Sequence, residues 1–153
     1  MSVTYRRLTA DEFLCAPNLE RLIDAYSDEA SIPGMPAYRI HVATYKMLED
    51  AGALAVFSAD YQGEMIGFIT ILSNVMPHYS AKLSTIESFF VLSEHRRRGA
   101  GLGLLRVAER HGAEIGSHGL FVSAPSSGQL AKVLPKFGYE QTNRTFFRKF
   151  EHE

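Results

Sequence analysis

The stretch that decides the fold is IESFFVLSEHRRRGAGLGLL, residues 86–105. Residues 86–92 are rich in β-branched and aromatic side chains, which is typical of a strand. From Gly101 to about Ile115, apolar side chains recur at helical spacing. The turn between them is rich in arginine and glycine. Its glycines allow a sharp bend, so that free main-chain N–H groups and the positive end of the helix dipole face the same site. This arrangement predicts a site for phosphate oxygens.

Two common phosphate-binding loops do not match this turn. Gly99, Gly101 and Gly103 give G-x-G-x-G, whereas the dinucleotide-binding fingerprint is G-x-G-x-x-G, and no G-x-x-x-x-G-K-[ST] run is present. The pattern that is present is R-x-x-G-x-G, formed by Arg96, Gly99 and Gly101.

Outward from the turn, helical and strand periodicities alternate within a single domain, residues 1–153. The expected elements are a strand at 3–7, a helix opened by Pro17-Asn18, a break at 32–36, a helix at about 39–50, a hairpin with strands at 54–57 and 65–72, a loop at 74–82, a strand at 83–92, a helix at 101–115, a strand at 120–124, a helix at 127–137 closed by Gly138, and a final strand or hairpin at 139–150. This order predicts a mixed α and β fold around one sheet.

The chain resembles the GNAT superfamily of acetyl-CoA-dependent N-acetyltransferases. The turn at 96–101 is similar to the family's [RQ]-x-x-G-x-[GA] signature, residues 86–91 to its preceding strand, and residues 131–139 to its late helix with a K-[LF]-G-[FY] tail. The resemblance covers most of the chain. It implies a central twisted, mostly antiparallel sheet with a splayed pair of strands and flanking helices.

The resemblance also implies a site for acetyl-CoA. Backbone groups of Phe89 and Val91, where the family's strand splays from its neighbour, would pair with the pantetheine arm as an added strand does. The N–H groups of residues 97–102 would hold the pyrophosphate, and the Val91 N–H would meet the developing oxyanion. The expected cofactor-binding residues are Phe89, Phe90, Val91, Arg96, Arg97, Arg98, Gly99, Ala100, Gly101, Leu102, Ser126 and Ser127.

Glu87 is the candidate catalytic base. An amine attacks a thioester only as the free base, so a group must take its proton. Counting by twos along the strand places Glu87 on the same face as Thr85, Phe89 and Val91. The family often has a glutamate at this position, and the alternative role is a structural salt bridge. His78 is a second candidate, as a base or as a substrate contact.

The late helix departs from the family's pattern. Many members have a tyrosine there that protonates the departing thiolate, whereas this chain has Leu134 followed by Pro135. Either Ser126, Ser127, a neighbouring tyrosine or water replaces that acid, or none is needed. A thiolate whose conjugate acid has a pKa of about 8–9, judged by cysteine, is a good leaving group near neutral pH. Pro135 is expected to kink or shorten the helix.

The expected activity is transfer of an acetyl group to a primary amine of a small molecule or peptide, by direct attack in a ternary complex. Residues 1–80 hold five Lys and Arg against ten Asp and Glu, and residues 81–153 hold eleven against seven. The acidic half is therefore expected to contact the acceptor, with Tyr38, His78 and Tyr79 as candidates. The alternative is a non-catalytic acyl-CoA-binding regulatory module. Pairing of two copies into a homodimer is left open.

Composition argues against several other classes. Cys15 is the one cysteine, so no internal disulfide forms, and the six histidines lack metal-ligand spacing, so no metal is expected. A sequence pI near 6.6 argues against nucleic-acid binding. No apolar stretch is long enough to cross a bilayer, and no signal-peptide core is present, so a cytoplasmic location without membrane attachment is expected.

Overall fold

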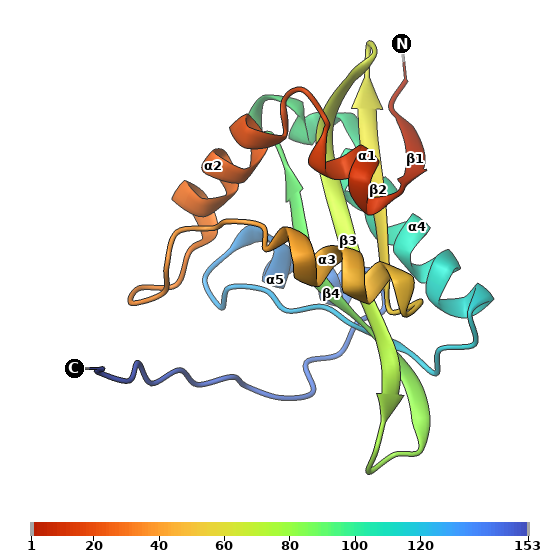
Figure 1. The fold of residues 1–153 in the computed structure, drawn as a ribbon, viewed down its shortest axis with the longest axis vertical. Helices are drawn as coiled ribbons and strands as arrows, with labels where there is room; N and C mark the ends of the chain where they lie inside the picture. Colours follow the sequence, from red (N-terminus) through yellow and green to blue (C-terminus); the bar gives the residue numbers. More distant parts are fainter. Residues whose placement is uncertain (1, 153) are drawn as a thin grey trace.

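One five-stranded sheet organises the computed structural model, which describes residues 2–152 (Figure 1). Strands β1 (Thr4–Leu8), β2 (Leu54–Tyr61), β3 (Glu64–Met76) and β4 (Ala81–Val91) follow one another in antiparallel pairs. Strand β5 (Leu120–Phe121) is parallel to β4 and pairs with it only at Ser84 and Thr85. The predicted fold class, with a mostly antiparallel sheet and a splayed pair of strands, is confirmed.

Helices cover both faces of this sheet. One face carries α1 (Ala10–Leu14), α2 (Leu19–Ala30) and α3 (Val42–Asp50), and the opposite face carries α4 (Ala100–Glu114). The short 3-10 helix η1 (Ser93–Arg98) joins β4 to α4, and α5 (Gln129–Val133) continues into a second 3-10 helix, η2 (Leu134–Phe137). The strand–turn–helix order around residues 86–105 is the predicted one.

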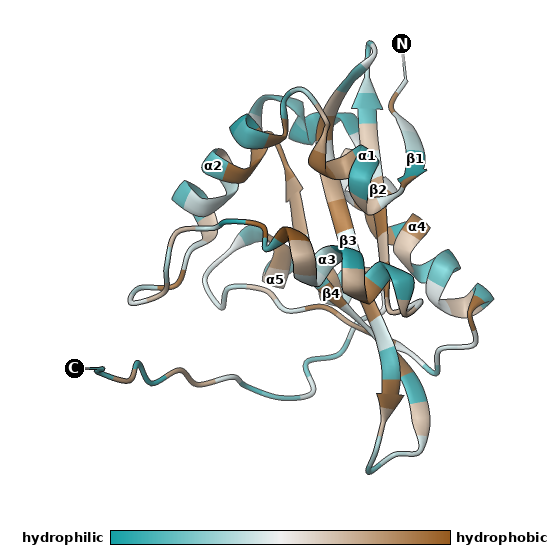
Figure 2. Ribbon diagram, viewed as in Figure 1, coloured by the Kyte–Doolittle hydropathy of each residue, from teal (hydrophilic) through white to brown (hydrophobic). Residues whose placement is uncertain are grey.

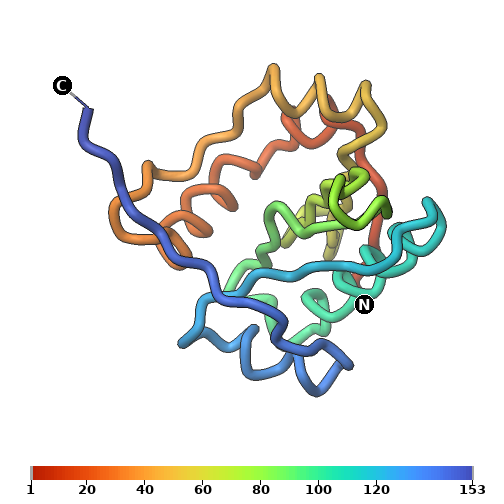
Figure 3. Tube along the Cα trace, turned by 90° about the horizontal axis from the view of Figure 1, so that it is seen from below, coloured from red at the N-terminus to blue at the C-terminus, as the bar shows by residue number. Residues whose placement is uncertain are grey.

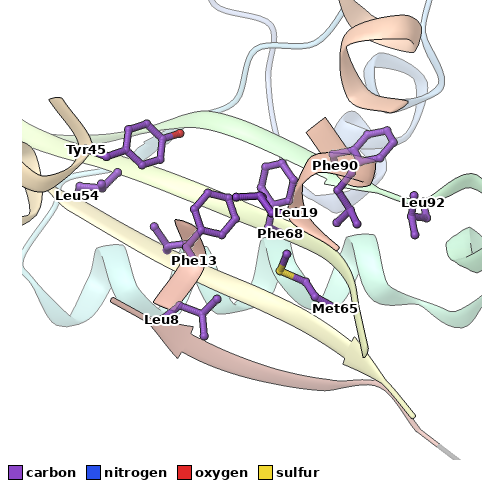
Figure 4. Close-up of a cluster of buried hydrophobic side chains, with 11 residues drawn as sticks. Leu8, Phe13, Leu19, Tyr45, Leu54, Met65, Phe68, Phe90 and Leu92 are labelled. Atoms are coloured by element: carbon purple, nitrogen blue, oxygen red, sulfur yellow. The ribbon is translucent and has the colours of Figure 1, made fainter. Parts of the chain in front are cut away.

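Strand alternation divides the core into two apolar layers. Phe68 packs with Phe13 and Phe90 beneath α1–α3 (Figure 4), whereas Ile69 packs against α4. In Figure 2 the residues of high hydropathy lie mainly on the central strands and on parts of the helices beside them. Each fully buried side chain of this size stabilises the fold by about 1.5–3 kcal/mol relative to an exposed one. The two layers hold β3 and β4 rigidly between helices.

The hairpin of β3 and β4 is longer than predicted. The loop expected at 74–82 is wrong at both ends, because β3 continues to Met76 and β4 begins at Ala81, with Val75 opposite Lys82. Cross-strand pairing overrides the turn-like composition of this segment. Helix α1 was not predicted. Its first turn is stabilised by a capping box between Thr9 and Glu12.

The C-terminal segment differs most from prediction. The strand or hairpin expected at 139–150 is wrong, since these residues form neither, and the strand expected at 120–124 shrinks to two residues. So short a β5 offers little backbone for a further strand to pair with. Figure 3 shows the segment crossing the molecule and passing beside the connection between α2 and α3 before it reaches the C-terminus. Phe146, Phe147 and Phe150 are all exposed, and the Phe147 ring lies beside Gly34.

The late helix is shortened as expected. It ends at Val133, and Pro135 lies in the 3-10 turn that follows, where its missing N–H costs no α-helical hydrogen bond. Gly138 ends this turn in the left-handed conformation.

Candidate active site

The outer edge of β4 is open beyond Thr85, because β5 pairs with two residues only and the chain then turns away (Figure 1). The Phe89 N–H donates to Tyr26 Oη at 3.2 Å, and the Val91 carbonyl accepts from Arg96 Nε at 3.0 Å. Both groups therefore point away from β3. In an antiparallel strand the N–H and C=O of one residue face the same side, so the Phe89 carbonyl and the Val91 N–H also face this edge. The edge suits an extended ligand with amide groups.

A site suited to an anion lies at one end of this edge. Gly99 has φ +79°, a left-handed conformation that favours glycine, and α4 begins at the next residue. The first intrahelical bond joins the Gly103 N–H to the Gly99 carbonyl, so the N–H groups of Ala100, Gly101 and Leu102 have no helical acceptor. No side chain caps the helix, and its first turn holds no acidic residue. These features fit the expected pyrophosphate.

The three arginines before this helix have different surroundings. Arg96 is held by the Val91 carbonyl and by Glu29, whose carboxylate lies 2.6 Å from its guanidinium. Arg98 lies 3.8 Å from the centre of the Tyr61 ring and donates to His95. Arg97 is exposed and makes no hydrogen bond or ion pair with residues 2–152. Of the three, Arg97 has the charge most available to a phosphate.

Glu87 occupies a β-bulge. Thr70 lies opposite Ser88 and Ile71 lies opposite Ile86, so Glu87 is the extra residue of β4. The bulge changes the alternation of side chains along the strand. Phe89 and Val91 pack toward α4, whereas Glu87 meets Thr70 and Tyr45 on the side of α1–α3. The expectation that Glu87 shares a face with Phe89 and Val91 is therefore wrong, because counting by twos does not detect an extra residue.

Two hydroxyl groups hold one oxygen of the Glu87 carboxylate. Tyr45 Oη donates to Oε2 at 2.7 Å and Thr70 Oγ1 donates to the same atom at 2.6 Å. Ser88 Oγ lies 2.6 Å from Thr70 Oγ1 and extends the chain of hydroxyls. Within the described chain, Oε1 takes no hydrogen bond, and the residue as a whole is exposed. The hydrogen bonds to Oε2 thus orient the Glu87 carboxylate, while Oε1 remains available to a ligand.

Tyr45 is a donor here and not an acid. Burial, together with the Glu87 carboxylate, raises the pKa of its phenol well above the ordinary value. The phenol therefore keeps its proton at neutral pH and stays hydrogen-bonded to Oε2. Its ring belongs to the apolar layer beneath α3, stacked near Phe13 (Figure 4). Neither Tyr45 nor Thr70 was predicted. At helical spacing Tyr45 resembles an ordinary core residue.

The other predicted residues lie in several places. Tyr38 packs edge-on against Tyr26 and donates its hydroxyl to the Ala30 carbonyl. His78 and Tyr79 lie at the tip of the β3–β4 hairpin. Glu87 lies six residue steps along β4 from Ala81, which is roughly 20 Å at about 3.3 Å per step. The structure therefore does not bring His78 and Tyr79 to Glu87.

Among residues 2–152, the late helix and the loop before it donate no hydrogen bond to Glu87. Ser126 and Ser127 are exposed in the loop between β5 and α5, and Leu134 is buried. The Tyr139 hydroxyl donates to Glu109 of α4 at 2.6 Å, so it is committed to holding the late helix. Phe90 sends its ring into the core, where it stacks on Tyr26.

The described residues offer few features of other kinds of site. Residues 2–152 contain no group of three or more His, Cys, Asp or Glu side chains arranged to hold a metal ion. Across the same residues, no helix combines the length and the apolar character that a membrane span requires. A cavity of about 640 Å³ is lined by residues 36–42, in the connection between α2 and α3.

Comparison with known proteins agrees with this geometry. Residues 19–139 match the Acetyltransferase (GNAT) family. An uncharacterized N-acetyltransferase of Chlorobaculum tepidum is 34% identical over 91 residues, which are 60% of this chain and 53% of that protein. The chain thus spans about half the length of this curated relative.

Solved structures share the fold. An aminoglycoside acetyltransferase from an uncultured soil metagenomic sample, in complex with sisomicin, has a TM-score of 0.75 and 18% identity over 97% of each chain. AAC(6')-Iy, in complex with the bisubstrate analogue CoA-S-monomethyl-acetylneamine, has a TM-score of 0.70 and 22% identity over 99% of this chain and 100% of its own. At such identities the likeness shows the fold alone.

Proposed function

Because the chain belongs to the GNAT acetyltransferase family, whose members use acetyl-CoA, we propose that it transfers an acetyl group from acetyl-CoA to a primary amine. The observation that carries this proposal is the position of Glu87. Its Oε2 is held by Tyr45 and Thr70, its Oε1 is free, and it lies two residues from the open edge at Phe89. A base therefore stands beside a backbone that suits the pantetheine arm.

The cofactor lies along β4 in this proposal. The Phe89 carbonyl and the Val91 N–H bind the amide-rich arm, while the N–H groups of residues 100–102 and the side chain of Arg97 bind phosphate oxygens. Arg96 already caps the Val91 carbonyl and Tyr26 caps the Phe89 N–H. Pairing of the arm with either group requires the corresponding side chain to exchange its partner.

Glu87 takes the proton in the chemical step. The amine nitrogen forms a bond to the acetyl carbon, the carbon–sulfur bond breaks, and the electron pair leaves on sulfur. Glu87 Oε1 accepts the proton that nitrogen loses, directly or through one water. Tyr45 and Thr70 hold the carboxylate in place during this transfer, which lowers the entropic cost of reaching the reactive geometry.

The acceptor is proposed as a small molecule or peptide that carries a primary amine. The neighbour bound to sisomicin supports cationic amines as a class. Negative charge in residues 1–80 would attract such an acceptor. Asp28 and Glu29, at the end of α2, are near Tyr26 in sequence and add to this charge.

The test compares Glu87→Gln with the wild-type protein, using acetyl-CoA, a panel of amines and release of free thiol as the signal. Loss of a general base lowers kcat by roughly 10²–10⁴-fold, and the Kd of CoA is expected to stay the same. Glu20→Gln is the matched control, because Glu20 is exposed on α2 and its side chain forms no hydrogen bond or ion pair within residues 2–152. Its kcat should equal that of the wild type.

Three other outcomes contradict parts of the proposal. Unchanged turnover in Glu87→Gln removes Glu87 from the role of base. Saturable CoA binding without turnover on polyamines, aminoglycosides, amino acids or peptides favours the acyl-CoA-binding module, for which Leu134 in place of tyrosine is the motivating feature. Absence of CoA binding in the wild type contradicts both functions.

A further inference from the structure

Tyr26 has a hydroxyl at the open edge of β4 that the proposed mechanism does not yet use. Its Oη accepts a hydrogen bond from the Phe89 N–H at 3.2 Å. In the described part of the chain this is the hydroxyl's one hydrogen bond, so its own proton has no protein acceptor. A partly buried phenol in this state has a donor ready for a ligand.

The surrounding aromatic rings fix where that hydroxyl lies. The Tyr26 ring stacks on Phe90, with centroids 5.1 Å apart and planes 25° apart. Tyr38 packs edge-on against it at 4.7 Å and Phe68 at 6.0 Å. These contacts involve the ring and not the oxygen, so a phenylalanine at position 26 can keep them.

The hydroxyl also lies at the reacting end of the edge. Phe89 stands between Val91, near the phosphate end, and Glu87, the proposed base. Burial raises the pKa of Tyr26, and the nearby Tyr38 and the Glu87 carboxylate raise it further, against the opposing effect of the Phe89 N–H. The phenol therefore remains neutral at physiological pH. It can donate a hydrogen bond but is poorly suited to giving up its proton.

We propose that Tyr26 is a catalytic residue whose hydroxyl donates a hydrogen bond to the oxygen of the acetyl thioester. This inference rests on the proposed function. As nitrogen bonds to the acetyl carbon, negative charge gathers on that oxygen, and it returns to form the amide carbonyl when the carbon–sulfur bond breaks. Tyr26 keeps its proton throughout. The Phe89 N–H polarises the hydroxyl, which strengthens its donation.

Tyr26 does not replace the tyrosine acid that many family members have at the position of Leu134, because Tyr26 keeps its proton. The leaving thiolate takes its proton from solvent, and Leu134 needs no substitute. The Val91 N–H remains available on the same edge as a second donor or as a partner of the pantetheine arm.

The experiment uses acetyl-CoA labelled with ¹³C at the carbonyl carbon, bound to the wild type and to Tyr26→Phe. A donor on the oxygen moves the bound carbonyl resonance downfield, so we expect it to lie upfield in the variant. Loss of one such donor lowers kcat by roughly 10²–10³-fold, while the Kd of acetyl-CoA stays within about threefold. Tyr139→Phe is the matched control, because it removes another partly buried tyrosine hydroxyl, one that donates to Glu109 of α4 and not to a group of β4.

The outcomes separate the two proposals. If the wild type binds acetyl-CoA and turns over, but Tyr26→Phe shows the same ¹³C resonance and the same kcat, the inference is overturned and the transferase function stands. If Tyr26→Phe binds acetyl-CoA more tightly at unchanged kcat, Tyr26 only occupies the Phe89 N–H in competition with the cofactor. This result also overturns the inference. If the wild type does not bind acetyl-CoA, the proposed function itself fails.

Discussion

The Glu87 carboxylate is held by hydroxyls from two different elements, Tyr45 of α3 and Thr70 of β3. A hydrogen bond to a charged group contributes about 1.5–3 kcal/mol. Both bonds fall on Oε2, so they orient the carboxylate without occupying Oε1. Tyr45 and Thr70 are therefore positioning residues for the proposed base, and either can be altered without touching the substrate.

Tyr45→Phe should show this positioning role. The ring keeps its place beside Phe13, but Glu87 loses one donor and becomes less constrained. We expect kcat to fall about tenfold, the equivalent of about 1.4 kcal/mol, with the KM for acetyl-CoA and for the amine unchanged. Steady-state rates with each substrate varied in turn measure this. A rise in KM at constant kcat would assign Tyr45 to substrate binding.

Sequence reasoning found Glu87 but not its partners, for a physical reason. Glu87 lies in a strand next to a recognisable turn, so its neighbourhood in sequence identifies it. Tyr45 is 42 residues away on a helix whose apolar spacing explains a tyrosine equally well as core. Tyr26 is missed in the same way. Several tyrosines occupy core positions, and helix packing determines which of them directs its hydroxyl toward β4. The spacing of apolar residues within one helix does not predict that packing.

At the scale of elements, the connection from β4 to α4 determines where an anion can bind. Gly99 adopts φ +79° and Gly116, just beyond the other end of α4, adopts φ +83°. Neither position has a heavy atom within 4 Å of an added Cβ. A side chain at either residue thus meets conformational strain and no collision.

Replacing each glycine by alanine should therefore separate binding from stability. Left-handed backbone costs a residue with a Cβ about 1–2 kcal/mol, so both variants should have lower, and similar, free energies of unfolding. Only Gly99→Ala is expected to raise the Kd of CoA, because only that strain moves the N–H groups at the start of α4. Denaturant titration and calorimetry measure the two effects. Equal CoA affinity in both variants would argue against a phosphate site at this turn.

The elements themselves were predicted well where periodicity is strong. The starts and ends of α4 and of the core part of β4 lie within two residues of expectation, because apolar spacing and glycine define them locally. The hairpin tip and the C-terminal segment were not. Residues 74–82 pair in spite of turn-like composition, and residues 139–150 lack a partner in spite of strand-like composition. In both cases the presence or absence of a neighbouring strand determines whether the segment forms a strand. The sequence of the segment alone does not predict which strand lies beside it.

At the scale of the whole molecule, a buried histidine of α4 packs against the sheet. His111 is buried and its ring meets the edge of Phe57 on β2. Burial lowers its pKa, Arg7 of β1 lowers it further, and Glu114 of α4 opposes them. The folded protein therefore favours the neutral form of His111 more than the unfolded chain does.

Stability should consequently fall as the pH falls through the ordinary histidine pKa of about 6.5. Below that pH the unfolded chain binds a proton that the folded state resists, which favours unfolding. We expect the Tm of the wild type to decrease between pH 7.5 and pH 5.5 by more than that of His111→Gln. His118→Gln, at an exposed position, should keep the wild-type dependence. Parallel curves for wild type and His111→Gln would refute this account.

The bulge at Glu87 has a consequence for which sequences this sheet can accept. If β4 paired with β3 without a bulge, position 87 would face the apolar layer under α4, where an isolated carboxylate is costly to bury. The extra residue places Glu87 on the side of α1–α3, while Ile86 and Phe89 both stay in the layer under α4. If the same residues paired without a bulge, keeping Phe89 under α4 would bring Glu87 into that apolar layer and move Ile86 out of it.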